Sequence, residues 1–142
     1  MNLGVGNAIG LNATSRRQGK VMTDTTPYLQ MPMVNFDTIV LECIITSYGV
    51  IIDAQVGLVD GWVNTELSKG NPNIKTFVNN VEVIPPYTNH YYKHVFIKLV
   101  MPNVVNDDVA IFSHFNNTAK TFGKIYSIKY YLAGNLVHYN EY

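Results

Sequence analysis

Apolar and polar residues alternate along several stretches of this chain, which is the pattern of a strand with one buried face. The clearest stretches are residues 37–47, 91–101 and 126–132. In the first, Ile39 and Leu41 fall on one face and Thr38 and Glu42 on the other. Apolar residues at helical spacing are not sustained over any window of about 11 residues. The chain is therefore expected to be all-β, with little helix.

The C-terminal residues 120–142 predict a closing β-hairpin. Two alternating runs are separated by Ala133-Gly134-Asn135, and Gly and Asn tolerate the positive φ of a tight turn. Tyr126, Ile128 and Tyr130 are expected to share one face of the first run. A terminal strand is normally ordered only when it pairs within a sheet, so this hairpin is expected to complete the sheet.

A second hairpin is predicted at Asn79-Asn80, which lies between two short β-branched runs. The strand at 50–56 is expected to pair with 37–47, and residues 102–107 are expected to form a loop. About nine to eleven short strands separated by turn signals indicate an antiparallel two-sheet sandwich, with a closed barrel as the alternative. The other strands are expected at 28–32, 62–63, 74–78, 81–84 and 109–115.

The pattern divides the chain into an N-terminal arm or linker, residues 1–26, and one β-sandwich domain, residues 27–142. The arm holds four of the ten glycines among small and polar residues. Three of these, Gly4, Gly6 and Gly10, miss the spacing of a nucleotide-binding loop, and no strand is predicted before them.

Composition argues against charged partners. Ten basic and ten acidic residues cancel, so nucleic acid and membrane insertion are not expected. Charged residues make up only 14% of the chain and aromatic residues 12%, a balance that suits contact with sugar or protein. The single cysteine, Cys43, lies in an apolar run and is expected to be buried and inert. No apolar stretch approaches the roughly 18 residues of a membrane span, and no signal peptide is recognised.

The segment VAIFSHFNN, followed by FGKIYSIKYYLAGNLVHYNEY, resembles a pattern found in bacteriophage virion proteins. In those proteins it closes a domain similar to the laminin G and concanavalin A-like lectins. The match is carried by residues 115–117, 123–126 and 134–137, and it extends upstream to Thr26. Asn80 replaces the usual hairpin glycine, and His138 replaces the charged residue that commonly follows the "LV" pair.

This resemblance implies a jelly-roll sandwich in a tail fibre, head fibre or baseplate, and therefore a location in the virion. It implies a receptor-binding, host-adhesion role in which the module binds a host cell-surface glycan. Other virion proteins and a homo-oligomer, taken to be a trimer, are the further partners that it implies. The alternative is a purely structural module for capsid decoration or fibre assembly.

A sugar site needs an aromatic ring that stacks on the sugar and side chains that match its hydroxyls. Two loops offer such groups, the first at residues 60–64 and the second at 87–92. The sequence leaves open whether the sole tryptophan, Trp62 in the first loop, is exposed or fills the core. In the second loop, adjacent tyrosines in a strand force one ring outward. The predicted carbohydrate-binding residues are Asp60, Trp62, Asn64, Tyr87, Asn89, His90, Tyr91 and Tyr92.

No metal, cofactor or catalytic site is predicted. His90 and His94 would lie about 13 Å apart on a strand, too far for one metal ion. Asp107-Asp108, with Asn103 and Asn106, offers oxygen ligands for calcium, but turn formation explains the same residues and is favoured. The glutamates follow no glycosidase pattern, and no nucleophile motif is present, so the chain is not expected to be an enzyme.

Overall fold

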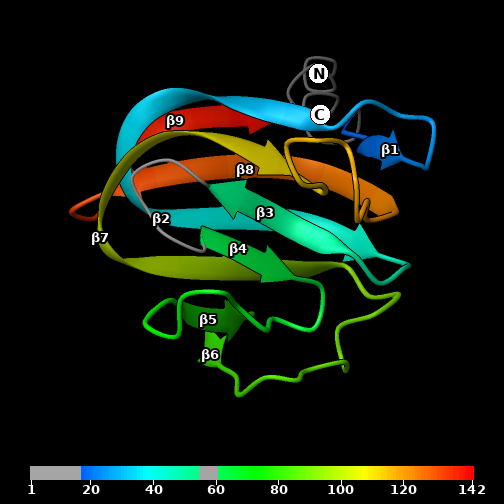
Figure 1. Cartoon of the computed structure of the whole chain (residues 1–142), viewed down its shortest axis with the longest axis horizontal. Helices are drawn as coiled ribbons and strands as arrows, with labels where there is room; N and C mark the ends of the chain where they lie inside the picture. The colour runs from blue at the N-terminus through cyan, green and yellow to red at the C-terminus, as the bar shows by residue number, and fades with distance from the viewer. Residues whose placement is uncertain (1–16, 55–60) are drawn as a thin grey trace, which may run out of the picture.

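The computed structural model describes residues 17–54 and 61–142, in which nine antiparallel strands form one sheet without any helix (Figure 1). The expected all-β antiparallel class is confirmed. The order of the main strands across the sheet is β1-β8-β2-β7-β3-β4. The strands are β1 Lys20–Met22, β2 Leu29–Ile45, β3 Val50–Ala54, β4 Gly61–Asn64, β5 Lys75–Val78, β6 Val81–Glu82, β7 Val95–Ile111, β8 Gly123–Leu132 and β9 Asn135–Glu141.

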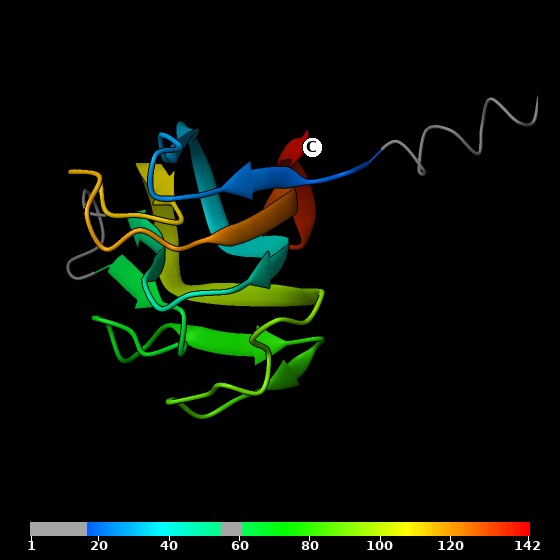
Figure 2. The ribbon, with the colours of Figure 1, turned by 90° about the vertical axis from the view of Figure 1, so that its right-hand side faces the viewer.

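Two long strands, β2 and β7, bend the sheet over on itself. Each has 17 residues, and they pair with each other along most of their length. The register slips between Met31 and Val34 and again between Phe36 and Thr38, where β7 curves from one layer to the other (Figures 1 and 2). A proline cannot donate to the ladder, which suits it to such irregular positions. Pro32 lies within the first slip, and Pro102 lies opposite the second.

The bend corrects two predictions from the sequence. Residues 102–107 are not a loop, because they form the curved middle of β7. The strand β3 does not pair with residues 37–47 either, since its partners are β4 and β7. The chain crosses from one layer to the other between β2 and β3. The strand β3 therefore lies in the layer opposite residues 37–47 and pairs there with the end of β7. Turn and proline signals mark a change of direction, but they do not distinguish a loop from a bent strand.

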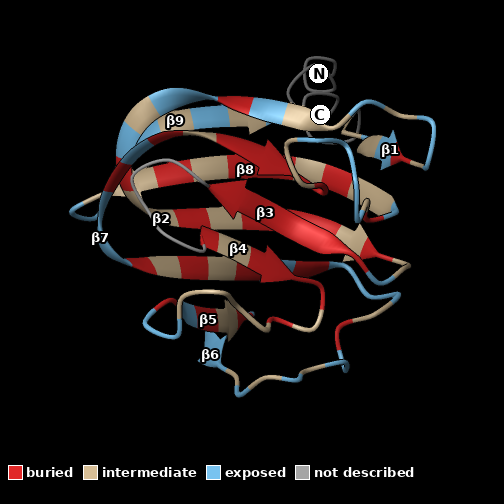
Figure 3. Cartoon of the chain, in the orientation of Figure 1, coloured by how far each residue is buried: buried red, intermediate tan, exposed pale blue. Residues whose placement is uncertain are grey.

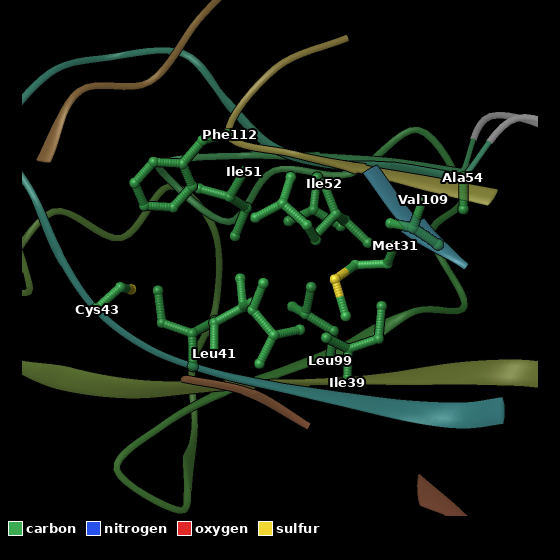
Figure 4. Close-up of a cluster of buried hydrophobic side chains, with 14 of the residues drawn as sticks. Met31, Ile39, Leu41, Cys43, Ile51, Ile52, Ala54, Leu99, Val109 and Phe112 are labelled. Carbon is green, nitrogen blue, oxygen red and sulfur yellow. The ribbon is translucent and has the colours of Figure 1, made fainter. Parts of the chain in front are cut away.

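The core lies between the two layers. Figure 4 shows Ile51, Ile52 and Phe112 of one layer facing Leu41 and Leu99 of the other, and all five are at most 1% exposed. Buried and more exposed residues alternate along β2, β7 and β8 in Figure 3, as the sequence pattern predicted. Burial of each such side chain contributes about 1.5–3 kcal/mol to folding, so this core is the main source of stability.

Both predicted hairpins are present. The turn between β5 and β6 has Asn79 and Asn80 at φ of 50° and 67°, and the turn between β8 and β9 has Ala133 and Gly134 at 49° and 82°. The N–H of Tyr142 donates to the carbonyl of Tyr126 in β8 at 2.9 Å. The C-terminal strand is therefore paired within the sheet, as the sequence predicted.

The edge of the sheet beyond β8 is built from both ends of the described chain. β9 pairs with the later part of β8, and β1 pairs with its first residues. The N–H of Gly19 donates to the carbonyl of Tyr142 at 3.3 Å, which joins the two segments end to end. β1 comes from the segment assigned to the arm, and its Met22 is 2% exposed in the core.

Candidate functional site

The outward side chains of three neighbouring strands form a regular array on the outer face of the sheet. In β2, Ile39 and Leu41 are fully buried, so the residues that alternate with them, Thr38, Val40 and Glu42, point away from the core. The strand register places each outward residue of β2 between one residue of β7 and one of β8. The three rows of this outer array are Val100–Thr38–Tyr131, Lys98–Val40–Lys129 and Phe96–Glu42–Ser127.

A groove of about 430 Å³ lies over the outer array. Eight of the nine array residues line it, all except Glu42, and the hairpin-turn residues Asn80 and Gly134 also line it. Its volume falls in the range of about 300–1,000 Å³ that small-molecule sites occupy. None of its ten lining residues is acidic. The groove therefore combines aromatic rings, hydroxyl groups and two ammonium groups on a rigid floor.

Two lysines lie across the middle of the groove. Lys98 and Lys129 flank Val40, and strands are about 4.8 Å apart, so the two lysine backbones are separated by about 10 Å. Each ammonium group lies over an aromatic ring of the next strand outward. The distance is 4.5 Å for Lys98 and the ring of Phe77, and 5.3 Å for Lys129 and the ring of Tyr139. Such contacts contribute about 0.5–1 kcal/mol at exposed sites and hold the charges in place.

The third row of the array holds a buried carboxylate. Glu42 is 4% exposed, and it accepts hydrogen bonds from the guanidinium of Arg17 at 2.5 and 2.9 Å. Ser127 donates its hydroxyl to the same carboxylate at 3.2 Å, and Nε2 of His94 lies 2.7 Å from it. Arg17 also lies 3.4 Å from the carboxylate of Glu141 in β9. Through this Glu42 cluster, Arg17, which precedes β1 in the chain, is bound to the outer face of the sheet.

The cluster determines the protonation of Glu42. Burial acts to raise the pKa of this carboxyl, but the hydrogen bonds from Arg17 and His94 and the charge of Arg17 outweigh burial and lower the pKa. Glu42 is therefore ionised at neutral pH, and the guanidinium of Arg17 compensates its charge.

A bulge in β8 brings an aromatic residue to this cluster. The register with β2 slips between Glu42 and Cys43, so Tyr126 leaves the alternation. Its ring stacks on His94, with centroids 4.4 Å apart. The expectation that Tyr126 shares a face with Ile128 and Tyr130, which are both fully buried, is thus wrong, because one extra residue reverses the side on which a strand residue points.

The first predicted sugar loop contributes to a smaller hollow on another part of the surface. Trp62 is half-buried and lines this hollow of about 240 Å³ with Tyr48, Asn64 and His114. Asn64 donates its amide to the hydroxyl of Tyr48 at 3.2 Å, and Nδ1 of His114 lies 2.7 Å from the buried carboxylate of Asp53. The hollow is smaller than about 300 Å³, the lower end of typical ligand sites. Asp60 lies outside the described residues.

The second predicted loop folds largely onto itself. The imidazole of His90 is 1% exposed and stacks between the rings of Tyr87 and Tyr91, with centroids 5.5 and 4.9 Å away. Burial lowers the pKa of His90, although a backbone hydrogen bond at Thr65 and the charge of Glu66 oppose this shift. A packed, neutral imidazole of this kind serves the structure of the loop.

The two loops meet at a contact between hydroxyl groups. The hydroxyl groups of Tyr91 and Thr65 lie 2.7 Å apart, beside Asn64. Tyr92 is 74% exposed, so one of the adjacent tyrosines does point outward. Asn89 is exposed as well, and Tyr87 lines a different hollow beside β5 and β6. Trp62 and Asn64 thus line one hollow and Tyr87 another, so the predicted site residues that the structure describes are not gathered in one place.

The candidate calcium ligands belong to a strand. Asp107 is buried in β7, and Asn106 donates its amide to the side-chain oxygen of Asn35 at 2.6 Å. Within residues 17–54 and 61–142, no three His, Cys, Asp or Glu side chains are grouped closely enough to hold a metal ion. Cys43 is fully buried, as expected, and burial raises the pKa of its thiol to about 12.

Sequence reasoning identified most of the outward residues of the array but did not assign them a function. Alternation along residues 37–47 sets Thr38 and Glu42 opposite the apolar residues, and along 91–101 it does the same for Phe96 and Lys98. The predicted site residues, by contrast, all come from two loops. A usable signal was present, because large apolar side chains gathered on an outward face mark an interaction surface.

Comparison with protein-family models, with curated proteins and with solved structures finds no match to this chain. None of the described segments is a helix that is long and apolar enough to cross a membrane. The arrangement of residues in the groove is therefore the basis for a functional conclusion.

Proposed function

We propose that this chain is a non-catalytic carbohydrate-binding module and that the groove over the outer array holds the sugar. One observation carries the proposal: aromatic, hydroxyl and ammonium groups from β2, β7 and β8 converge on one groove of about 430 Å³. The rings of Phe96 and Tyr131 lie at opposite corners of the array. They offer apolar faces of the kind on which the C–H face of a pyranose stacks.

The polar lining supports the same ligand class. The hydroxyls of Thr38 and Ser127 donate to the carboxylates of Asp37 and Glu42, at 2.9 and 3.2 Å, and keep lone pairs that accept from a sugar hydroxyl. Asn80 presents an amide at the end of the groove. Hydroxyls and amides both donate and accept hydrogen bonds, which is what neighbouring sugar hydroxyls require. These side chains lie on paired strands or a tight hairpin turn, so little conformational entropy is lost when a ligand binds.

We further propose that the module belongs to a virion, as a host-adhesion component with a jelly-roll sandwich. The resemblance of residues 115–137 to phage virion proteins motivates the location. The bent sheet, in which β2 and β7 contribute to both layers, supports the jelly-roll assignment. Under this proposal, the partners are a glycan of the host surface and other virion proteins.

Calorimetric titration, guided by a glycan array, tests the proposal. Tyr131→Ala and Phe96→Ala are each expected to weaken glycan binding by about tenfold or more, since an aromatic anchor in a binding site typically contributes more than 1 kcal/mol. Tyr92→Ala is the matched control, because this exposed ring lies outside the groove. Absence of binding at millimolar glycan would contradict the proposal, as would equal losses in all three variants.

The second candidate is a structural module for fibre or capsid assembly. Exposed aromatic and apolar side chains outside the groove favour it, namely Tyr48 at 65% exposed, Tyr92 at 74%, and Leu136 at 52% on the edge strand β9. In such a module, these residues would pack between subunits, and the groove would have no ligand.

A further inference from the structure

We infer that the groove over the outer array selects a saccharide that carries carboxylate groups. The inference rests on the proposed carbohydrate-binding function and adds the charge of the ligand. It follows from the place of Lys98 and Lys129 in the array and from the absence of acidic residues in the groove lining.

Both lysines are available to an anionic ligand. In the described part of the chain, neither ammonium group forms a salt bridge, and each rests on an aromatic ring instead. A ring contact leaves the N–H groups of an ammonium free to donate hydrogen bonds elsewhere. The two lysine backbones are about 10 Å apart, with Val40 as an apolar floor between them. Each ammonium group lies farther out, over the ring of the next strand, so the pair of charges suits an oligosaccharide rather than a single sugar.

The acidic residues nearby have partners other than the two lysines. Asp37, next to Thr38, accepts hydrogen bonds from the Thr38 hydroxyl at 2.9 Å and from the N–H of Ala133 at 3.0 Å, and it does not line the groove. Glu42, in the adjacent row, is matched by the guanidinium of Arg17 at 2.5 and 2.9 Å and by His94 at 2.7 Å. Glu82 lies beyond Phe77 in β6 and does not line the groove. The two lysine charges in the groove are therefore not balanced by a negative charge among the lining residues. The carboxylate groups of a ligand would provide that negative charge.

The position of the groove favours a saccharide over an acidic peptide. Extended peptides bind sheets mainly at free edges, where unpaired backbone groups accept a further strand. The groove lies instead on the face of β2, β7 and β8, and each of these strands has paired neighbours on both sides. Binding on this face depends on side chains, and the hydroxyl, amide and aromatic groups present suit a sugar.

The test compares matched ligands and matched variants. The ligands are uronic acid oligosaccharides and sialylated glycans on an array, each beside its methyl ester, which keeps the sugar and removes the charge. The variants are Lys98→Gln and Lys129→Gln, with Lys124→Gln as the control. Lys124 also lies in β8, but it lines a different hollow with Val21 and Phe122.

We expect carboxylated glycans to bind at least tenfold more tightly than their methyl esters, and rising salt to weaken binding. Lys98→Gln and Lys129→Gln should each lower the affinity by about tenfold, the size of a charge-assisted hydrogen bond, while Lys124→Gln leaves it unchanged. Equal binding of acids and esters would overturn the inference and leave the proposed function standing. Absence of binding to any glycan would overturn both, and binding of a poly-glutamate peptide with the same lysine dependence would overturn the choice of a saccharide.

Discussion

Glu42 shows how one residue gains a role that its place in a strand does not reveal. In the sequence, it is a polar residue on the outward face of an alternating run. In the fold, it is a buried carboxylate that holds Arg17, His94 and Ser127 together. Because the charge is buried, removal of a partner costs more than loss of an exposed ion pair would.

The stability of the protein is expected to depend on pH through Glu42. Folding lowers the pKa of this carboxyl, so its contribution is complete above the ordinary glutamate pKa of about 4.3 and is lost as pH falls through the folded pKa. Glu42→Gln should lower the free energy of unfolding by about 2 kcal/mol at pH 7 and by less at pH 3.

Urea unfolding at the two pH values measures this difference. Glu82→Gln is the control, because Glu82 is exposed and belongs to a two-residue edge strand. If Glu42→Gln destabilised the protein equally at pH 3 and pH 7, the loss would come from packing and not from charge.

At the scale of elements, the central feature is the close approach of β8 to β2. Gly123 begins β8 with φ of 145°, and a Cβ atom there would lie 1.9 Å from the carbonyl oxygen of Ile44. Only glycine allows the two backbones to pair at this point. The sequence shows a glycine at position 123 and hence a position with backbone freedom. It does not show which strand this glycine approaches, because β8 and β2 pair across a long separation in the chain.

Gly123→Ala is therefore expected to separate the start of β8 from β2 and to destabilise the protein by about 3 kcal/mol or more. Gly134→Ala is the matched control: Gly134 has φ of 82° but nothing within 4 Å of an added Cβ, so it carries only the backbone cost, about 1 kcal/mol. Chemical denaturation of both variants measures the two losses. Equal losses would show that the contact with Ile44 adds nothing.

At the scale of the whole molecule, the two candidate functions would use different surfaces. Carbohydrate binding uses the groove on one face of the sheet, whereas assembly would use exposed residues elsewhere, among them Tyr48 and Tyr92. A variant of one surface should therefore leave the other function intact. Distant sites contribute independently when they share no partners.

Light scattering of the double variant Tyr48→Ser, Tyr92→Ser tests this separation. We expect its glycan affinity to equal that of the unchanged protein, because neither ring lines the groove. Its molar mass should also be unchanged, because assembly through these rings belongs only to the structural module. Tyr131→Ala changes the groove instead of the assembly residues. We expect this variant to keep its molar mass and to bind glycan more weakly. A trimer that dissociates in the double variant would favour the structural module.

The sequence by itself determined the local features of this fold. Strand type, the buried faces of β2 and β7, the two tight turns and the burial of Cys43 all follow from residue order, because alternation and turn preferences act between near neighbours. The tertiary structure decided the bend of β2 and β7 and the bulge at Tyr126. It also decided the register that sets Lys98, Val40 and Lys129 in one row. These features depend on pairing between residues distant in the chain, which no local pattern specifies.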